Sequence, residues 1–293
     1  MSRARVSSTP TAGLYSQLVR VLPALFLGAA LCTTASGAVS RHVVEQANTG
    51  TVQAQLSYDY HAYRFGNPRL TIQRAGVTLR DAPVRAPRRE FDAQPANYFA
   101  HRKSVFVRDL DGDREPEVYL DLYAGGAHCC WYTEVFRYAA GRYSLQTQIW
   151  WNVGYRSADL DRDGLLEFVS GDNRFAYEFA DFAESRWPIQ IWSYRAGRFT
   201  DVTRRFPAAI ARDARALFRS QTNRRYFPAT NHGVLAAWAA DECLLGRCAS
   251  AFKKLEAMGR AGQLRNHGAC CDSTTRAYLR HLRRFLRRTG YLG

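Results

Sequence analysis

The sequence predicts an α+β protein in which a β-rich, propeller-like module precedes an α-helical region. Three observations predict this order. Short runs that alternate between apolar and polar residues, separated by Gly-containing turns, continue to about residue 203. From residue 207 onward, apolar residues recur at helical spacing. Two acidic loops with matching spacing each lead into a strand-like run, so we expect repeated, blade-like units.

The chain length and composition allow a substantial core. The protein has 293 residues, of which 46% are hydrophobic and 13% aromatic, so it is not a disordered chain. We expect one large or two modest domains. The boundaries that we predict are a signal peptide at 1–38, the β-rich module at 39–203 and a basic helical region at 204–293.

The first 38 residues have the features of an export signal. Arginines precede the apolar stretch Val21–Cys32, and Ser36 and Ala38 are small residues that suit a cleavage site. The apolar stretch is too short to span a bilayer as a stable helix. We therefore expect a secreted, periplasmic or cell-envelope protein. The alternatives are an uncleaved membrane anchor and, less favoured because Leu31 precedes it, a lipid anchor at Cys32.

The β-rich module is expected to consist mainly of hairpins. Residues 39–55 are polar and give no assignment, and the Pro- and Arg-rich stretch 83–95 is expected to be a loop. Ala-Gly pairs at 75–76, 140–141 and 196–197 predict three tight turns. The strands that we expect lie at 70–72, 77–79, 104–107, 118–120, 134–138, 143–145, 168–169 and 189–194, with a further strand around Phe199.

Four helices are expected after Pro207. The first is the Ala-rich segment 208–219, and apolar stripes mark the next two at 234–245 and 252–258. The last helix carries apolar residues from Leu279 to Leu286 with arginines around them. Asp272 or Ser273 is expected to cap its start, and Gly290 to end it.

The positive charge is concentrated in the helical region. Residues 204–293 contain 18 Arg and Lys against five Asp and Glu, a net charge of +13, whereas the whole chain carries +15. The Arg-rich last helix could bind an anionic surface such as lipid headgroups or envelope polymers, and another protein is a further candidate partner. Nucleic acid is disfavoured for an exported chain. The alternative is a solvated basic face.

Six cysteines remain after the predicted signal, and an even number in an exported protein favours disulfides. They are Cys129, Cys130, Cys243, Cys248, Cys270 and Cys271. The sequence does not fix the pairing. A vicinal Cys129–Cys130 bridge is one alternative, but we favour separate partners for these two. We also favour crosswise pairing of Cys243 and Cys248 with Cys270 and Cys271, although Gly246 could break the helix between the first two.

The two acidic loops predict cation sites. The first reads Asp109-Leu-Asp111-Gly-Asp113-Arg-Glu-Pro-Glu117 and the second Asp159-Leu-Asp161-Arg-Asp163-Gly-Leu-Leu-Glu167, so acids occupy loop positions 1, 3, 5 and 9 in both. Ca²⁺ takes about six to eight oxygen ligands, and a backbone carbonyl near position 7 can add one. Mg²⁺ is less suited because it keeps its waters. The alternative is a pair of solvated turns.

At these loops the chain resembles the FG-GAP/VCBS family of secreted and surface proteins, whose motif is Asp-x-Asp-Gly-Asp-Gly-x-x-Asp before a strand. The resemblance covers roughly residues 104–203 and implies a β-propeller or a propeller fragment with Ca²⁺ in its loops. The implied ligands are Asp109, Asp111, Asp113, Glu117, Asp159, Asp161, Asp163 and Glu167. Arg114 and Arg162 each replace a motif glycine, and two copies are fewer than the family usually has.

The motifs favour a non-enzymatic binding or scaffold protein of the bacterial envelope. His128-Cys129-Cys130 has neither the arrangement of a Cys/His nucleophile nor that of a zinc site, and its Gly125–Cys130 stretch resembles uncharacterised secreted proteins. No nucleophile elbow or phosphate loop is present in the sequence. An exported hydrolase with an unidentified site is the alternative. Trp131, Tyr132, Trp150 and Trp151 are candidates for an aromatic binding platform.

Overall fold

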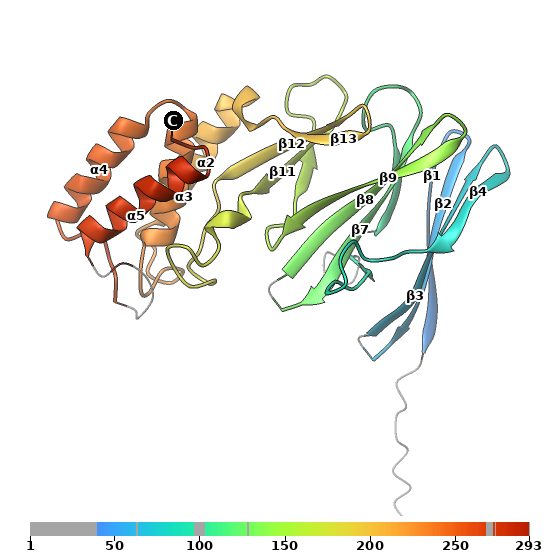
Figure 1. Ribbon diagram of the computed structural model, residues 1–293, viewed down its shortest axis with the longest axis horizontal. Coiled ribbons are helices and arrows are strands. Elements are labelled where there is room, and N and C mark those ends of the chain that lie inside the picture. The colour runs from blue at the N-terminus through green and yellow to red at the C-terminus, as the bar shows by residue number, and fades with distance from the viewer. Residues whose placement is uncertain are drawn as a thin grey trace, which may run out of the picture. The chain divides into compact units, whose positions relative to one another are not determined.

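The first of three antiparallel sheets comes from the stretch that the sequence left partly unassigned. The computed structural model describes residues 40–62, 64–96, 103–127, 129–267, 272 and 274–292. The sheet follows chain order, with β1 (Arg41–Thr49), β2 (Val52–His61), β3 (Arg64–Arg74) and β4 (Val77–Pro83) (Figure 1). Because side chains alternate between faces, apolar residues of β2 and β3 are buried on one side and Gln and Thr lie on the other.

The second sheet contains β5 (Gln94–Pro95), β6 (Val105–Arg108), β7 (Glu117–Gly126), β8 (Cys129–Ala139) and β9 (Arg142–Trp151). The third contains β10 (Arg156–Ala158), β11 (Glu167–Gly171), β12 (Ile189–Arg195) and β13 (Arg198–Asp201). In both sheets an acidic loop joins the first two strands of a four-stranded meander, β6 to β9 or β10 to β13. The repeat predicted from the sequence is therefore a repeat of structure. The described part of the chain contains no closed barrel or propeller.

The three Ala-Gly turns form as predicted. In each turn the alanine has a φ of 48° to 50° and the glycine a φ of 79° to 82°. Two consecutive residues with positive φ match a type I′ turn, whose twist suits the flanking strands. The turns connect β3 to β4, β8 to β9 and β12 to β13.

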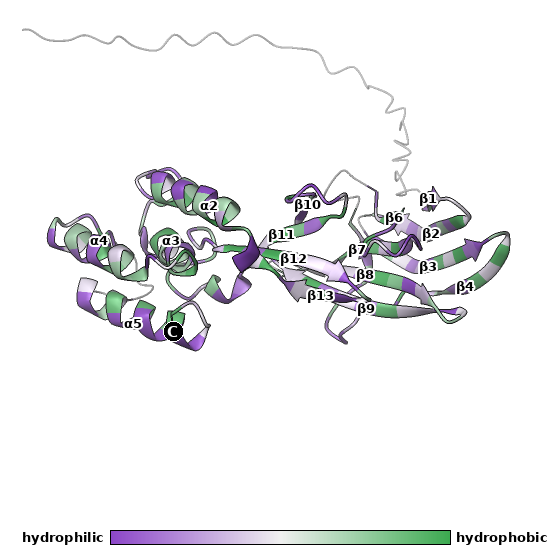
Figure 2. Ribbon diagram, turned by 90° about the horizontal axis from the view of Figure 1, so that it is seen from above, coloured by the Kyte–Doolittle hydropathy of each residue, from purple (hydrophilic) through white to green (hydrophobic). Residues whose placement is uncertain are grey.

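Four α-helices follow, in the places that the apolar spacing predicts. They are α2 (Pro207–Ser220), α3 (His232–Leu244), α4 (Cys248–Arg260) and α5 (Thr275–Arg288), preceded by the short 3₁₀ turns η1 (Asn173–Phe175) and η2 (Thr203–Arg205). Hydrophobic and hydrophilic residues alternate along α4 and α5 (Figure 2). The predicted cap of α5 was wrong, because Thr274 accepts the N–H of Ala277 and is the N-cap. Gly290 follows the helix with a φ of 81°.

Four apolar clusters connect the sheets and helices in sequence. The first two sheets share a core that includes Leu56, Leu70 and Leu120. Leu110, Trp150, Phe168 and Tyr194 fill the space between the second and third sheets. The third sheet packs through Ile191 on Ile210 of α2, and the helices enclose a further core around α3. Residues 39–293 consequently group as one unit, and the predicted domain boundary at 203/204 stays a prediction.

Candidate metal centre

The local fold places the two acidic loops in equivalent positions. The first connects β6 to β7 and the second connects β10 to β11. The position-9 acids, Glu117 and Glu167, are the first residues of β7 and β11, and they pair with Arg108 and Ala158 across the ladder. Each loop therefore closes between two paired strands, and the last acid returns to the residues that follow the preceding strand.

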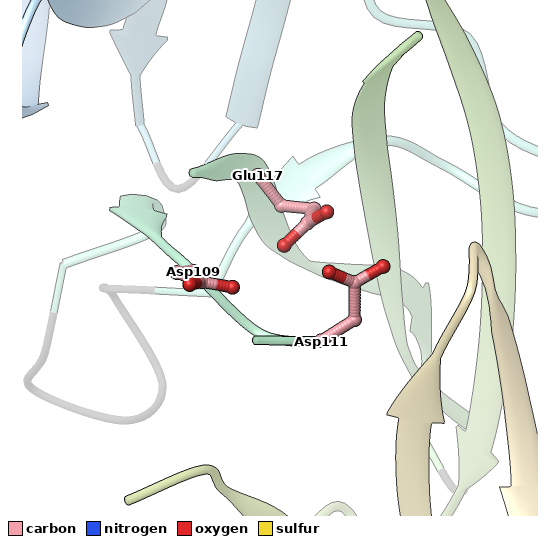
Figure 3. A group of neighbouring side chains, drawn as sticks. All are labelled: Asp109, Asp111 and Glu117. Carbon is pink, nitrogen blue, oxygen red and sulfur yellow. The ribbon is translucent and has the colours of Figure 1, made fainter. Parts of the chain in front are cut away.

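Three carboxylates of each loop converge. Oxygens of Asp109, Asp111 and Glu117 lie within 4.8 Å of one another, and the same holds for Asp159, Asp161 and Glu167. Figure 3 shows the first three facing a common space. Among the residues that the structure describes, these are the two groups of His, Cys, Asp or Glu that could hold a metal ion.

The position-5 acids do not join these groups, although the sequence predicted them as ligands. Asp113 accepts the backbone N–H of Glu115 at 2.8 Å with one oxygen and an Arg137 nitrogen at 2.6 Å with the other. Asp163 likewise accepts the N–H of Leu165 at 2.8 Å. Both side chains thus stabilise the turn, as short acidic side chains commonly do.

Backbone N–H groups hold the first acid of each loop. Asp109 accepts the N–H groups of Gly112 (2.7 Å) and Arg114 (2.9 Å), and Asp159 accepts those of positions 163 (3.1 Å) and 164 (3.0 Å). Loop positions 4 and 6 both need a positive φ. Gly112 and Gly164 adopt it at 82° and 89°, whereas Arg114 and Arg162 adopt it at 70° and 65°. An L-residue in this region is disfavoured by about 1–2 kcal/mol, so each loop tolerates one strained arginine where the family motif has glycine.

The position-9 glutamates are buried, and Glu117 is only half satisfied. One oxygen of Glu117 accepts the N–H of Leu110 at 2.8 Å, and Glu167 accepts that of Leu160 at 2.9 Å. The other Glu117 oxygen is buried and accepts no hydrogen bond. Burial raises the pKa of Glu117 to about 8, with the neighbouring acids adding to the rise, and burial also raises the pKa of Glu167.

Arginines that the sequence reasoning missed reach both loops. Arg137 donates to Asp111 at 3.0 Å and lies 3.8 Å from the free oxygen of Glu117. Arg195 lies 3.3 Å from Asp163 and 3.6 Å from Glu167. Arg137 lies on β8 and Arg195 on β12, in the Ala-Gly hairpins that follow the two loops. They do not occupy equivalent positions, because Arg137 lies four residues before Gly141 and Arg195 two residues before Gly197, so the sequence repeat carries no signal for these contacts.

The two loops are neighbours. A Cβ atom on Gly112 would lie 3.1 Å from a Leu165 methyl carbon, and Arg195 donates to the backbone carbonyl of Leu110 at 3.3 Å as well as to Asp163. Arg195 therefore touches both loops. Gly197 in turn adjoins the side chain of Arg137. The two loops and the two arginines therefore form one group of neighbouring charges.

The donor set fits a hard divalent cation. Each group consists of carboxylate oxygens only, and Glu117 offers a buried oxygen without a donor beside Asp109 and Asp111. Such oxygens are ligands that Ca²⁺ prefers. Without a metal, the resident guanidinium groups offset part of the repulsion among the acids. The predicted position-7 carbonyl ligands remain a prediction.

The cysteine pairing differs from both expectations. Cys243 at the end of α3 pairs with Cys248 at the start of α4, so the expected crosswise pairing was wrong. Gly246, with a φ of 74°, ends the helix between them and brings their Cα atoms to 4.1 Å. Cys129 and Cys130 are paired with each other rather than with separate partners. His128, Cys270, Cys271 and Ser273 lie outside the described residues.

The expected aromatic platform does not form as one surface. Tyr132 and Trp150 are buried, with exposures of 1% and 2%, and Trp131 is half-buried. Trp151 is exposed and lies under the guanidinium of Arg88. Among the described residues, no helix is both long and apolar enough to cross a membrane.

The family comparison concerns the helical region, whereas the curated relatives align over longer stretches of the chain. Residues 210–290 match a family described as the sll0997 C-terminal domain. A probable thylakoid lumen protein, sll0997 of Synechocystis sp., is 33% identical over 146 residues, which are 48% of this chain and 43% of that protein. The uncharacterized protein y4bJ of Sinorhizobium fredii is 29% identical over 244 residues, 77% of this chain and 37% of that protein. The chain thus spans less than half the length of the curated relatives it matches. No solved structure matches the chain. The similarity to a known family is confined to residues 210–290, which match the sll0997 C-terminal domain.

Proposed function

We propose that this chain is an exported, non-enzymatic binding or scaffold protein of the bacterial cell envelope whose β-rich part is stabilised by Ca²⁺. The observation that carries the proposal is the duplicated carboxylate group. The same three loop positions converge twice, each time at the start of the second strand of a meander. A turn that only faces solvent gives no reason for the same arrangement to occur twice, whereas a metal ion bound in each loop would require it in both.

Export is supported by two independent features. The N-terminal residues have the order of a cleavable signal, and a curated relative is described as a probable thylakoid lumen protein. The thylakoid lumen is named as the compartment of that relative only. For this chain, the signal and the paired cysteines support a secreted or periplasmic location.

The β-rich part is also proposed to derive from an FG-GAP/VCBS-type repeat. The meanders β6 to β9 and β10 to β13 each place an acidic loop after the first strand and an Ala-Gly hairpin at the end. Blades of propellers are four-stranded antiparallel sheets of this kind. Two such units would form a fragment of a propeller.

Calcium titration by calorimetry tests the metal sites. We expect the EDTA-stripped protein to bind two Ca²⁺ per chain with dissociation constants of roughly 10⁻⁴–10⁻³ M. Asp111→Asn and Asp161→Asn should each remove one site, while Glu90→Gln, which alters an exposed acid away from the loops, should keep both. Equal calcium binding by all four proteins would reject the loops as the sites.

A second candidate function is binding to anionic lipid, and α5 carries the observation that favours it. Its apolar face is buried in the helical core, so Arg276, Arg280, Arg284 and Arg287 face solvent. Within the described part of the chain, none of these four forms an ion pair. Arg283, by contrast, is paired with Glu256 at 2.8 Å.

Sedimentation with vesicles tests this candidate. Vesicles with about one-third phosphatidylglycerol should retain the protein at low salt and release it at high salt, because screening weakens the attraction. The triple change Arg280→Glu, Arg284→Glu and Arg287→Glu should abolish retention, while Arg283→Gln should not. Retention that survives the triple change would exclude α5 as the contact.

A further inference from the structure

A polar groove lies where the first sheet meets β6 and β7. It has a volume of about 890 Å³, and its lining comes from β1, β2 and β3 on one side and β6 and β7 on the other. We call it the amide groove after five of its side chains, which are Gln46, Asn48, Gln53, Gln55 and Gln73. Its size falls within the range of ligand sites for small molecules.

Strand register places these amides on one face. Gln46 pairs with Gln55, which pairs with Thr71, and Asn48 pairs with Gln53, which pairs with Gln73. The floor is therefore two parallel rows of polar side chains that run across three strands. The opposite face of the same strands is buried in the apolar core, so the rows cannot turn inward.

The amides retain unused hydrogen-bonding capacity. A side-chain amide offers two N–H donors and a carbonyl acceptor. Gln46 donates to Gln55 at 3.0 Å and Gln73 to Thr78 at 3.4 Å. Within the described ranges, the side chains of Asn48 and Gln53 form no hydrogen bond. The floor thus presents donors and acceptors side by side.

An aromatic side chain and two cations form the wall. Phe106 on β6 is half-buried and stacks on Tyr119 of β7, with ring centroids 4.7 Å apart and planes 12° from parallel. Lys103 precedes the strand and Arg108 ends it, and both line the groove. No Asp or Glu is among the described residues that line the groove.

We propose that the amide groove binds an oligosaccharide, which gives the ligand class of the binding role proposed above and rests on that role. Sugar hydroxyls both donate and accept, so they match a floor of amides, and the C–H face of a pyranose ring can lie on an aromatic wall. The two cations add a preference for sugars that carry a carboxylate or phosphate.

Two other ligand classes fit the groove less well. An extended peptide binds by pairing with a sheet edge, but most of the floor belongs to β2 and β3, whose backbone groups pair with a strand on both sides. Nucleic acid affinity comes mainly from many phosphate contacts, and this groove has only two cations among its described lining residues.

An oligosaccharide array tests the proposal with the full chain. Each neutral oligosaccharide is printed beside a counterpart that carries a uronate or a phosphate. We expect retention on a subset of glycans, and the double change Gln53→Ala with Gln73→Ala should weaken it by about tenfold or more, because each lost hydrogen bond is worth about 1 kcal/mol. Gln146→Ala on β9, outside the groove, is the matched control.

The array separates this proposal from its competitors. Phe106→Leu keeps the wall apolar but removes the ring, so it should also weaken retention. Stronger retention on the anionic glycans that weakens with salt would show that Lys103 and Arg108 contribute to binding. Equal retention on neutral and anionic glycans would show that the amides alone recognise the ligand. No retention on any glycan, or retention unchanged by the double change, would overturn the proposal. The calcium titration is independent, since metal binding can succeed while the array fails, and the reverse.

Discussion

Arg137 decides how the first acidic loop is neutralised. Its guanidinium contacts Asp111 and Asp113 and lies near Glu117, and the Asp111 side chain beneath it is only 2% exposed. A buried acid that loses its partner is costly, whereas a bound Ca²⁺ can replace the arginine as the local positive charge. The arginine and the metal therefore share the task of balancing the same carboxylates.

Removing this arginine should make the protein more dependent on calcium. We expect Arg137→Met to destabilise the protein in EDTA by about 1–3 kcal/mol, because the acids lose their charge-assisted donor. The stabilisation gained on adding Ca²⁺ should then be larger than in the wild type. Thermal melts of both proteins, with and without Ca²⁺, measure the two effects. Arg142→Met, on the exposed part of the same hairpin, is the control, and an unchanged calcium increment would contradict the shared role.

A buried histidine predicts part of the pH dependence. His232 is 2% exposed, stacks on Tyr278 and has a ring nitrogen without a partner. Burial lowers the pKa of His232 to about 4, with a small opposing effect from Asp272. Between about pH 4 and its usual value near 6.5, the unfolded chain binds a proton that the folded chain does not.

The contribution of His232 to stability should therefore fall as the pH drops through that window, opposite in sign to the contributions of Glu117 and Glu167, whose raised pKa values favour the folded state at lower pH. The full contribution is present above about pH 6.5 and is lost toward pH 4, and it amounts to on the order of 3 kcal/mol. Urea denaturation at pH 7 and pH 5 measures the loss. His232→Gln does not titrate at this position, so its stability should lack this loss over the same interval. Identical pH slopes for the two proteins would show that another group is responsible.

Among the elements, α3 and α4 are tied at their junction by Cys243–Cys248. The bridge closes a loop of only a few residues, so its expected contribution is at the lower end of the range, about 2 kcal/mol. The double change Cys243→Ser with Cys248→Ser should lower the melting temperature by roughly 4–8 °C, at about 2–4 °C for each kcal/mol in a chain of this size. An unchanged melting temperature would mean that packing alone fixes the junction.

The elements that the sequence predicted best have strong local signals. The Ala-Gly turns and the apolar stripes of the helices specify their structure within a few residues, and the two acidic loops carry their motif in nine. β1 was missed because its face outside the core is polar and its alternation is weak. The pairing of Cys243 with Cys248 was missed because it depends on where α3 ends, which the sequence shows only through Gly246.

The contacts of the site depend on long-range packing. Arg137 and Arg195 lie 24 and 32 residues beyond the acids that they contact, Asp113 and Asp163. No local pattern relates these positions, and only the folding of each meander brings its last hairpin back over its loop. The amide groove has the same origin, because its wall and floor come from different sheets.

At the scale of the molecule, the loops lie inside a continuous series of apolar cores. Leu110 of the first loop and Phe168 beside the second loop belong to the apolar cluster between the second and third sheets. The third sheet also contacts α3, because the carboxylate of Asp241 accepts the backbone N–H of Ile189 at 3.2 Å. Tyr291 near the C-terminus donates to Asp172 at 2.9 Å. Stabilisation of the loops by a bound cation should therefore also stabilise the packing on the helices. It should raise the unfolding temperature of the whole chain.

The most direct test of calcium stabilisation is a thermal melt of the oxidised protein in EDTA and in about 2 mM Ca²⁺, which is near the dissociation constants expected for extracellular sites. Two occupied sites should add about 1–4 kcal/mol and raise the melting temperature by several degrees. The double change Asp111→Ala with Asp161→Ala should remove this rise. A melting temperature that does not respond to calcium would contradict the account and leave the neighbouring arginines to balance the acids of the two loops.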